Sequence, residues 1–374
     1  MCKNKNQTNY KMKQTVFYSK HEALGAKLAP FAGFNMPIQY EGLVAEHQHV
    51  RAKVGVFDVS HMGLIYVNGP KAFELVQYVT SNDLALISDG KVQYSCFPND
   101  KGGIVDDFLI YQINPESYLL VVNASNIEKD YNWLQENNKN IGAEIVNESD
   151  NYSILAIQGP LAMATVKKLT NEPVEEMKYY TFKYINFAGI DNVLFSITGY
   201  TGEAGCEIYF KNEDADKIWD AVFEAGKEFD IKPVGLASRD TLRLEMGFCL
   251  YGNDIDDTTS PIEAGLGWIT KFTENNQFVN RKYHEDLKAN GVEKRLVGFE
   301  MIDRGIPRHG YEIADADGNI IGNVTSGTQG PSVGKSIGLG YVKREMAKAD
   351  TEIYIVVRGK LLKAVTVKLP FYKS

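Results

Sequence analysis

The sequence predicts an α+β fold of several domains that ends in a separate small β-barrel or sandwich. Helical and strand-like periodicities alternate before residue 281 without the strict βαβ rhythm of a doubly wound sheet. Three strand-like runs follow one another between residues 92 and 123, separated by the turn-forming segments N-D-K-G-G and N-P-E-S. After about residue 290, short apolar runs alternate with glycines, which is typical of a small barrel or sandwich.

Each element before residue 281 is predicted from its own periodicity. Leu43, His47 and Val50 recur at helical spacing, and the three runs between 92 and 123 predict an antiparallel meander. Gly247 closes a helix that begins at residue 236. In chain order we expect helices at 21–28, 43–53, 71–80, 127–137, 160–169, 213–228 and 236–247, and strands at 54–67, 92–98, 104–113, 118–123, 153–158, 192–198 and 206–210.

Length and composition narrow the class of protein. A chain of 374 residues is too long for one ordinary core and predicts two or three domains. A formal net charge of -8 argues against nucleic acid as the main partner, because a phosphate-reading surface is normally basic. No apolar run approaches the roughly 20 residues that span a bilayer, so we expect no membrane partner. Residues 1–11 lack the apolar core of a secretory signal. We expect residues 1–12 to be a disordered tail, or to result from a translation start that was assigned too far upstream.

The sequence offers no pattern for a metal or a nucleotide cofactor. Its four cysteines form no C-x-x-C pair and adjoin no pair of histidines, so neither a zinc site nor a disulfide framework is predicted. The phosphate-binding patterns G-x-x-x-x-G-K-[ST] and G-x-G-x-x-G after a strand are also missing. We therefore expect neither cofactor.

Residues 199–208, G-Y-T-G-E-A-G-C-E-I, link two strand-like runs through a glycine-rich turn. With a period of two along each strand, Tyr200 and Glu207 both project from a semi-polar face of the hairpin. A plain hairpin requires neither side chain at these places. The ordinary structural explanation, an exposed glutamate on a solvated sheet face, stays open at this point.

Two carboxylates and two guanidinium groups are further candidates for functional side chains. Asp106 and Asp107 end G-G-I-V-D-D before an apolar run, and strand alternation sends them to opposite faces, so only one can serve a given pocket. Aspartate is disfavoured inside a strand, so two aspartates at this place require a structural or functional explanation, unless both belong to the preceding turn. Arg239 and Arg243 share one helix face, either as functional cations or within a surface ladder of ion pairs.

Six segments of the chain together form a specific sequence signature, although each of them alone would be weak evidence for any one family. They are F-D-V-S-H-M-G, G-G-I-V-D-D-F-L-I-Y, G-Y-T-G-E-A-G-C-E-I, S-R-D-T-L-R-L-E-M-G, Y-G-N-D-I-D-D-T-T-S-P-I-E-A-G-L-G-W and T-S-G-T-Q-G-P-S. In this order they closely resemble the aminomethyltransferase family, the T-proteins of the glycine cleavage system. The resemblance covers roughly residues 15–372.

The resemblance implies a tetrahydrofolate-dependent transferase. In this family a lipoyl-bearing carrier, the H-protein, delivers an aminomethyl group, and the enzyme transfers its carbon to tetrahydrofolate. The products are 5,10-methylenetetrahydrofolate, ammonia and the dihydrolipoyl carrier. The substrate nitrogen is itself the nucleophile, so no metal or covalent enzyme intermediate is required. We expect a cytoplasmic monomer that contacts its H-protein partner transiently.

The resemblance also implies a cloverleaf of three domains around a central folate cavity. We expect a folate-binding catalytic region at 13–285, in which 13–60 with 145–250 and 61–144 with 251–285 form two intertwined α+β domains. The C-terminal β-barrel domain then covers 286–374.

The resemblance assigns roles to particular residues. Glu207 matches the carboxylate that accepts the 2-amino group and ring N–H of the pterin, as a carboxylate accepts a guanidinium. Arg239 matches its cationic partner, and Tyr200 matches an aromatic wall of the same cavity. On this interpretation the glycines of the hairpin let Tyr and Glu reach one pocket.

Asp107 matches the functional carboxylate of the family. Its expected task is to stabilise the positive charge that develops on the aminomethyl carbon as ammonia leaves. It can also take a proton from the folate as a general base. Tyr94, Asn123 and Met62 match positions that line the same cavity.

The sequence departs from the family pattern at two places, and two alternative functions stay open. Residues 235–239 read G-L-A-S-R where G-L-G-A-R is usual, and 278–281 read F-V-N-R where a glycine usually precedes the basic residue. One alternative is another folate-dependent enzyme on the same scaffold, such as a demethylase; the flavin-bearing kind would carry an N-terminal G-x-G-x-x-G. The other is a non-enzymatic folate-binding iron–sulfur assembly factor, whose K-G-C-x-x-G-Q-E motif this chain lacks.

Overall fold

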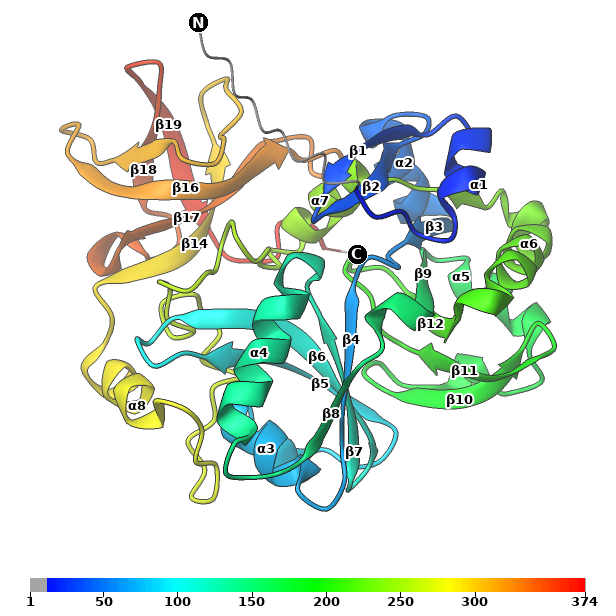
Figure 1. Ribbon diagram of the computed structural model, residues 1–374. Coiled ribbons are helices and arrows are strands. Elements are labelled where there is room, and N and C mark those ends of the chain that lie inside the picture. Colours follow the sequence, from blue (N-terminus) through cyan, green and yellow to red (C-terminus); the bar gives the residue numbers. More distant parts are fainter. Residues whose placement is uncertain (1–11, 374) are drawn as a thin grey trace, which may run out of the picture.

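The structure is a computed structural model that describes residues 12–373 (Figure 1). Two sheet-based lobes and a closed barrel surround a common centre. The predicted α+β cloverleaf with a C-terminal barrel is therefore confirmed. The expectations about residues 1–11 lie outside the described residues. No helix within residues 12–373 is long and apolar enough to cross a membrane.

The first lobe contains a six-stranded sheet with strand order β10-β11-β12-β9-β3-β13. Helices α5 and α6 cover one face of it, where their apolar side chains share a core with the strands. The elements of this lobe are α1 Tyr18–Ala23, β1 Lys27–Phe31, β2 Phe34–Gln39, α2 Leu43–Ala52, β3 Gly55–Asp58, β9 Tyr152–Gln158, α5 Ala162–Val166, β10 Phe182–Phe187, β11 Ile190–Ser196, β12 Gly205–Lys211, α6 Ala215–Gly226, β13 Lys232–Pro233 and α7 Leu236–Glu245.

Most predicted elements of this lobe are confirmed, but the single strand expected at 54–67 is divided into β3 and a second strand, Gly63–Asn68, that belongs to the second lobe. Strands β1, β2 and β13 were not predicted. The helix expected at 21–28 ends at Ala23 instead, because Gly25 adopts a φ of 71° and the chain continues into strand β1. Strand β10 was also not predicted, and its buried side chains, Phe182, Ile185 and Phe187, do not alternate regularly with exposed ones.

The second lobe contains a five-stranded sheet with strand order β5-β6-β7-β4-β8. The predicted meander forms its antiparallel centre. Helices α3 and α4 cover one face. The elements are β4 Gly63–Asn68, α3 Ala72–Val79, β5 Lys91–Pro98, β6 Ile104–Asn114, β7 Ser117–Val122, α4 Ile127–Asn138 and β8 Glu144–Asn147. Because β8 pairs with β4, residues 145–147 lie in this sheet and not in the first, where we expected them; the rest of the division into domains stays a prediction.

The two sheets pack against each other through the faces that the helices leave free. Tyr111 of β6 and Tyr209 of β12 belong to one core that spans both sheets, and their hydroxyls lie 2.8 Å apart. Side chains that face this core alternate along each strand with side chains that face the covering helices. Asp107 is four residues before Tyr111 on β6 and therefore lies on the same face of its sheet as Tyr111. Glu207 is two residues before Tyr209 on β12 and lies on the same face as Tyr209. Both carboxylates therefore face the region between the two sheets, which we call the central region.

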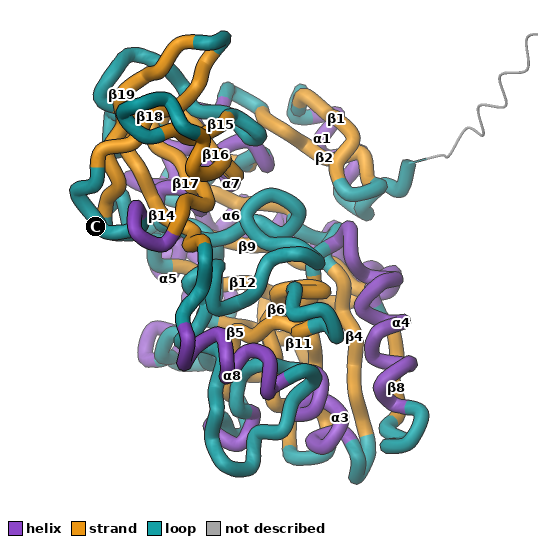
Figure 2. The backbone as a smooth tube through the Cα atoms, turned by 90° about the vertical axis from the view of Figure 1, so that its left-hand side faces the viewer, coloured by secondary structure: helices purple, strands orange, loops and turns teal. Residues whose placement is uncertain are grey.

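The third lobe is a closed barrel of six strands (Figure 2). Helix α8 precedes it within the predicted boundary stretch 281–295. The elements are α8 Arg281–Asn290, β14 Lys294–Met301, β15 Glu312–Ala314, β16 Ile320–Gln329, β17 Ser336–Lys343, β18 Glu352–Val357 and β19 Lys360–Val367. Asn280, which stands where the family usually has glycine, adopts a φ of 55°, a left-handed conformation that asparagine tolerates. This departure therefore leaves the connection to the barrel intact.

Arg243 of helix α7 ties the barrel to the rest of the molecule. Its side chain is only 1% exposed, and its guanidinium donates to Asp254 at 2.7 Å and to Ser326 of β16 at 2.9 Å. It also donates to the backbone carbonyl of Phe248 at 2.9 Å. Arg243 is thus a buried structural cation that fixes the loop at 248–254 against the barrel.

Glu245, at the end of α7, makes a second tie. Its carboxylate accepts hydrogen bonds from Arg51 at 3.0 Å and from the backbone N–H of Ser332 at 2.7 Å, and lies 3.1 Å from Nε2 of His47. Burial alone would raise the pKa of this carboxyl, but the hydrogen bond and charge of His47, with the bonds from Ser332, lower it to about 2.

Acid is therefore expected to weaken this tie. Because the folded-state pKa is depressed from its ordinary value of 4.5, the stabilisation is present above pH 4.5 and is lost as pH falls toward 2. Between pH 7 and about pH 3.5 the group loses about 1 kcal/mol of stabilisation. Urea unfolding of the protein and of Glu245→Gln at both pH values measures this, because the stability difference between them should shrink by that amount. A difference that stays constant with pH would contradict the assignment.

Candidate functional site

Two side chains hold the carboxylate of Asp107 at the central region. Tyr94, on the neighbouring strand β5, donates its hydroxyl to Oδ2 of Asp107 at 2.8 Å. Asn123, directly after β7, donates its side-chain amide to Oδ1 of Asp107 at 3.0 Å. All three side chains are half-buried, so each is held in place while part of its surface stays open.

The two adjacent aspartates have different environments, as strand alternation predicts. Asp106 is fully buried on the α4 side of the sheet, where Asn123 and Asn126 donate to it at 2.9 and 2.6 Å. Burial raises the pKa of Asp107 to about 7, and the charge of Asp106 adds to the rise, whereas the hydrogen bonds from Tyr94 and Asn123 oppose it. A carboxyl that titrates near neutral pH can hold a fixed charge or move a proton.

Glu207 of β12 faces the central region from the other sheet. Its Oε2 accepts hydrogen bonds from Thr198 at 2.6 Å and from Tyr209 at 3.3 Å. Within residues 12–373, Oε1 has no hydrogen-bond partner, and the side chain is half-buried. The explanation as an ordinary solvated glutamate does not fit, because the carboxylate has a fixed orientation and one oxygen available.

Arg239 of α7 lies beside Tyr200, with its guanidinium carbon 4.5 Å from the centre of the tyrosine ring. No carboxylate of the described chain forms an ion pair with Arg239, which is half-buried. Burial lowers the pKa of Arg239, while Tyr200 and Glu207 act to raise it. Tyr200 stacks on Phe248 and donates its hydroxyl to the backbone carbonyl of Cys249. Arg239 is therefore an unpaired cation next to a fixed aromatic ring.

The charged groups of the two sheets lie close enough to Arg239 and Tyr200 to affect their pKa values. The charge of Glu207 acts on Arg239, and the charge of Asp107 acts on Tyr200. Met62 is half-buried and packs against the core shared by the two sheets. The structure thus brings the seven residues predicted from the sequence to the central region: Met62, Tyr94, Asp107, Asn123, Tyr200, Glu207 and Arg239.

Comparison with known proteins identifies the family of this chain. The GCVT N-terminal domain family matches residues 17–274, and the glycine cleavage T-protein C-terminal barrel domain matches residues 294–373. An aminomethyltransferase of Bacteroides fragilis is 61% identical over 362 residues, which are 97% of this chain and 100% of that protein. The chain belongs to the aminomethyltransferase family, the T-proteins of the glycine cleavage system.

Other members of the aminomethyltransferase family agree with this assignment. An aminomethyltransferase of Flavobacterium psychrophilum is 58% identical over 363 residues, which are 97% of this chain and 100% of that protein. The crystal structure of the glycine cleavage system aminomethyltransferase T from Bartonella henselae superposes with a TM-score of 0.90 at 35% identity, and covers 96% of this chain and 98% of that chain. The resemblance stated from six sequence segments is therefore confirmed over nearly the whole chain.

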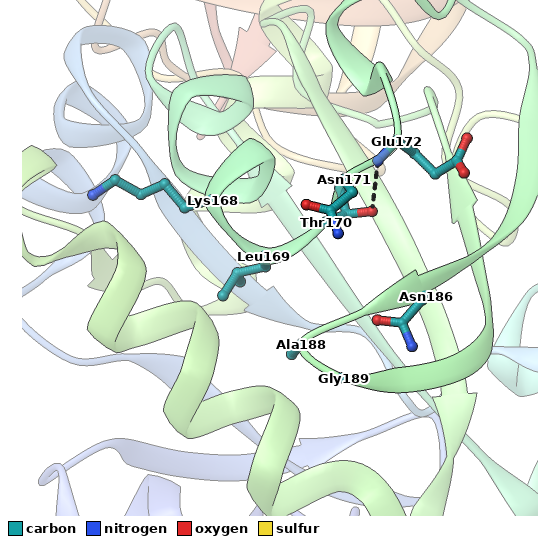
Figure 3. Close-up of a pocket in the computed structure, with 8 residues that line it drawn as sticks. All are labelled: Lys168, Leu169, Thr170, Asn171, Glu172, Asn186, Ala188 and Gly189. Atoms are coloured by element: carbon teal, nitrogen blue, oxygen red, sulfur yellow. Dashed lines mark hydrogen bonds between the residues drawn. The ribbon is translucent and has the colours of Figure 1, made fainter.

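A separate hollow lies on the outer surface of the first lobe (Figure 3). Its volume is about 400 Å³, and it is lined by Lys168, Leu169, Thr170, Asn171, Glu172, Asn186, Ala188 and Gly189. None of the seven predicted residues lines it. The hollow is therefore distinct from the candidate site in the central region.

Some supporting residues of the candidate site were missed as site residues. Thr198 and Tyr209, which hold Glu207, share its sheet face by strand alternation, so a signal for them was available. Tyr111 comes from the other sheet and bonds to Tyr209, and no local pattern points to that contact.

Proposed function

We propose that this chain transfers the methylene carbon of the aminomethyl group on the lipoyl arm of the H-protein to tetrahydrofolate. The reaction releases ammonia and leaves 5,10-methylenetetrahydrofolate and the dihydrolipoyl H-protein. One observation carries the proposal: within residues 12–373, Glu207 and Arg239 each keep an unpartnered polar group, at the region that Asp107 faces from the other sheet. A cytoplasmic monomer in transient contact with its H-protein is part of the proposal.

Tetrahydrofolate fits these groups as a substrate. A pterin presents its 2-amino group and a ring N–H side by side, and a carboxylate can accept both. Thr198 and Tyr209 fix the carboxylate of Glu207 through Oε2, while Oε1 stays available for the pterin. Arg239 supplies a nearby positive charge, and the ring of Tyr200 supplies an apolar wall.

Asp107 acts at the other end of the proposed site. Its fixed negative charge stabilises the positive charge that develops as ammonia leaves, and its carboxylate can accept a proton from the folate. Tyr94 and Asn123 each donate to one of its oxygens and so fix its orientation. A pKa of about 7 leaves about half of the Asp107 carboxyl groups ionised at neutral pH, and the ionised form can accept a proton.

Tyr94→Phe is expected to move the acid limb of the kcat–pH profile to higher pH. The hydroxyl of Tyr94 stabilises the ionised form of Asp107, so its loss raises the pKa of Asp107 above about 7. The shift should be up to about one pH unit, because one such hydrogen bond contributes about 0.5–1.5 kcal/mol. Tyr78→Phe, at an exposed tyrosine of α3, is the matched control. An unshifted limb would exclude this hydrogen bond from setting the titration of Asp107.

The direct test mixes the protein with tetrahydrofolate and aminomethyl-loaded lipoyl H-protein, and follows ammonia and methylenetetrahydrofolate together. Equal, enzyme-dependent formation of both products is the expected result. Tight folate binding without turnover would overturn the proposed donor, and the demethylase or assembly-factor alternatives would then take its place.

A further inference from the structure

A third carboxyl, Asp130, lies behind the site on helix α4. It is fully buried, and it lies within hydrogen-bonding reach of Asp106. Within residues 12–373, neither of its oxygens receives a hydrogen bond from an N–H or O–H group. Neither the sequence patterns nor the proposed reaction gives this residue a task.

Physical chemistry decides the protonation of Asp130. Burial of an ionised carboxylate without a hydrogen-bond donor is strongly unfavourable, and a second carboxylate nearby makes it more so. Asp130 lies near the N-terminus of α4, but the helix dipole stabilises an anion at this place only weakly. Desolvation destabilises the carboxylate more than the helix dipole stabilises it, so Asp130 is protonated and neutral. Burial accordingly raises the pKa of Asp130 well above its usual range, and the charge of Asp106 adds to this.

Asp106 has the opposite environment, because it is surrounded by donors. Its oxygens accept from the backbone N–H of Asn123 at 3.0 Å, from the side chain of Asn123 at 2.9 Å and from Asn126 at 2.6 Å. Burial raises the pKa of Asp106, whereas the hydrogen bonds from Asn123 and Asn126 act to lower it and favour the ionised form. The protonated Asp130 can then supply a fourth donor, its O–H group.

We infer that Asp130 is a positioning residue for Asp107. As a neutral acid it donates to the ionised Asp106, and Asp106 orients Asn123, whose side-chain amide donates to Asp107. The path runs from α4 through the buried face of β6 to its open face, and it keeps one fixed negative charge directly behind Asp107 (Figure 1 shows α4 against this sheet).

Other titratable groups surround this path. They are Tyr94 and Cys96 of β5, Lys129 of α4, and Tyr200, Cys249 and Tyr251 from the loops beside β6. Lys129 is the only cation among them, and its Nζ is bound to the hydroxyl of Tyr251 at 2.7 Å. None of these groups supplies a donor to Asp130 within the described chain.

The kinetic test compares Asp130→Asn with Asp130→Leu. Asparagine keeps a neutral donor, so the acid limb of the pH profile should stay within about 0.3 pH unit of the parent. Leucine fills the space without a donor, and kcat should fall about 3–10-fold further than in Asp130→Asn, the effect of one lost hydrogen bond. A limb that moves to lower pH in Asp130→Asn would mean that Asp130 carries a charge. Equal kcat values for the two variants would remove its positioning role.

The kinetic arm rests on the proposed function, so a spectroscopic arm tests the protonation alone. Infrared difference spectra compare Asp107→Asn with Asp107→Asn/Asp130→Asn at pH about 8, where the Asp107 carboxyl cannot contribute. A carbonyl band of a protonated carboxylic acid should be present in the first protein and missing from the second. Absence of that band from the first protein would overturn the inference, whether or not the protein transfers aminomethyl groups.

Discussion

Asp107→Asn should lower kcat by about 10²–10⁴-fold, the usual contribution of a positioned acid–base group, while tetrahydrofolate still binds. The amide keeps the shape of the side chain and a contact with Tyr94, but it removes the negative charge and the proton acceptor. The rate of methylenetetrahydrofolate formation, measured beside folate affinity by calorimetry, tests both halves of this expectation. In the parent, kcat should rise with pH through about pH 7 as Asp107 ionises.

The control for this variant is Asp317→Asn, at an exposed position of the barrel. It should leave the pH profile in place, because Asp317 is remote from the central region. Near-normal turnover in Asp107→Asn would remove Asp107 from the mechanism. Loss of folate binding together with turnover would instead assign it to the binding of the pterin.

Glu207→Ala should weaken tetrahydrofolate binding by about 2–5 kcal/mol, the cost of leaving a buried pair of donors unmatched. The carboxylate is already fixed by Thr198 and Tyr209, so the parent loses little freedom when the pterin binds. Calorimetric titration with tetrahydrofolate measures the difference. We expect KM for folate to rise much more than kcat falls, since Glu207 contacts the part of the substrate that does not react.

Glu213→Ala is the matched control, because this exposed glutamate lies just after the same strand. It should bind folate as the parent does. Unchanged affinity in Glu207→Ala would refute the pterin-binding assignment, and Arg239 with Tyr200 would then have to orient the pterin without a carboxylate.

Strand alternation predicted the faces of individual residues well. It sent Asp106 and Asp107 to opposite faces of the sheet, and the structure agrees. Alternation is a local property of an extended chain, so it needs no knowledge of the fold. Gly25 shows the limit of local reasoning, because a single left-handed residue ended a helix that periodicity alone continues to 28.

Arg243 shows a different limit. From the sequence, Arg239 and Arg243 were equivalent cations on one helix face, and a surface ladder was an open alternative. In the structure Arg243 bonds to Asp254 and to the barrel strand, while Arg239 lies beside Tyr200 and has no ion pair with any residue that the structure describes. The difference depends on which lobes pack against α7, and no sequence spacing contains that information.

The sequence by itself determined the family, the types of most elements and the identity of the candidate residues, because motifs and periodicity are properties of short segments. Tertiary structure decided that Glu207 of one sheet and Asp107 of the other face a common region. It also decided that Asp107 titrates near pH 7 and that Asp130 lies buried behind it. The physical reason is that burial and neighbouring charge set a carboxyl's behaviour, and both arise from residues that are distant along the chain.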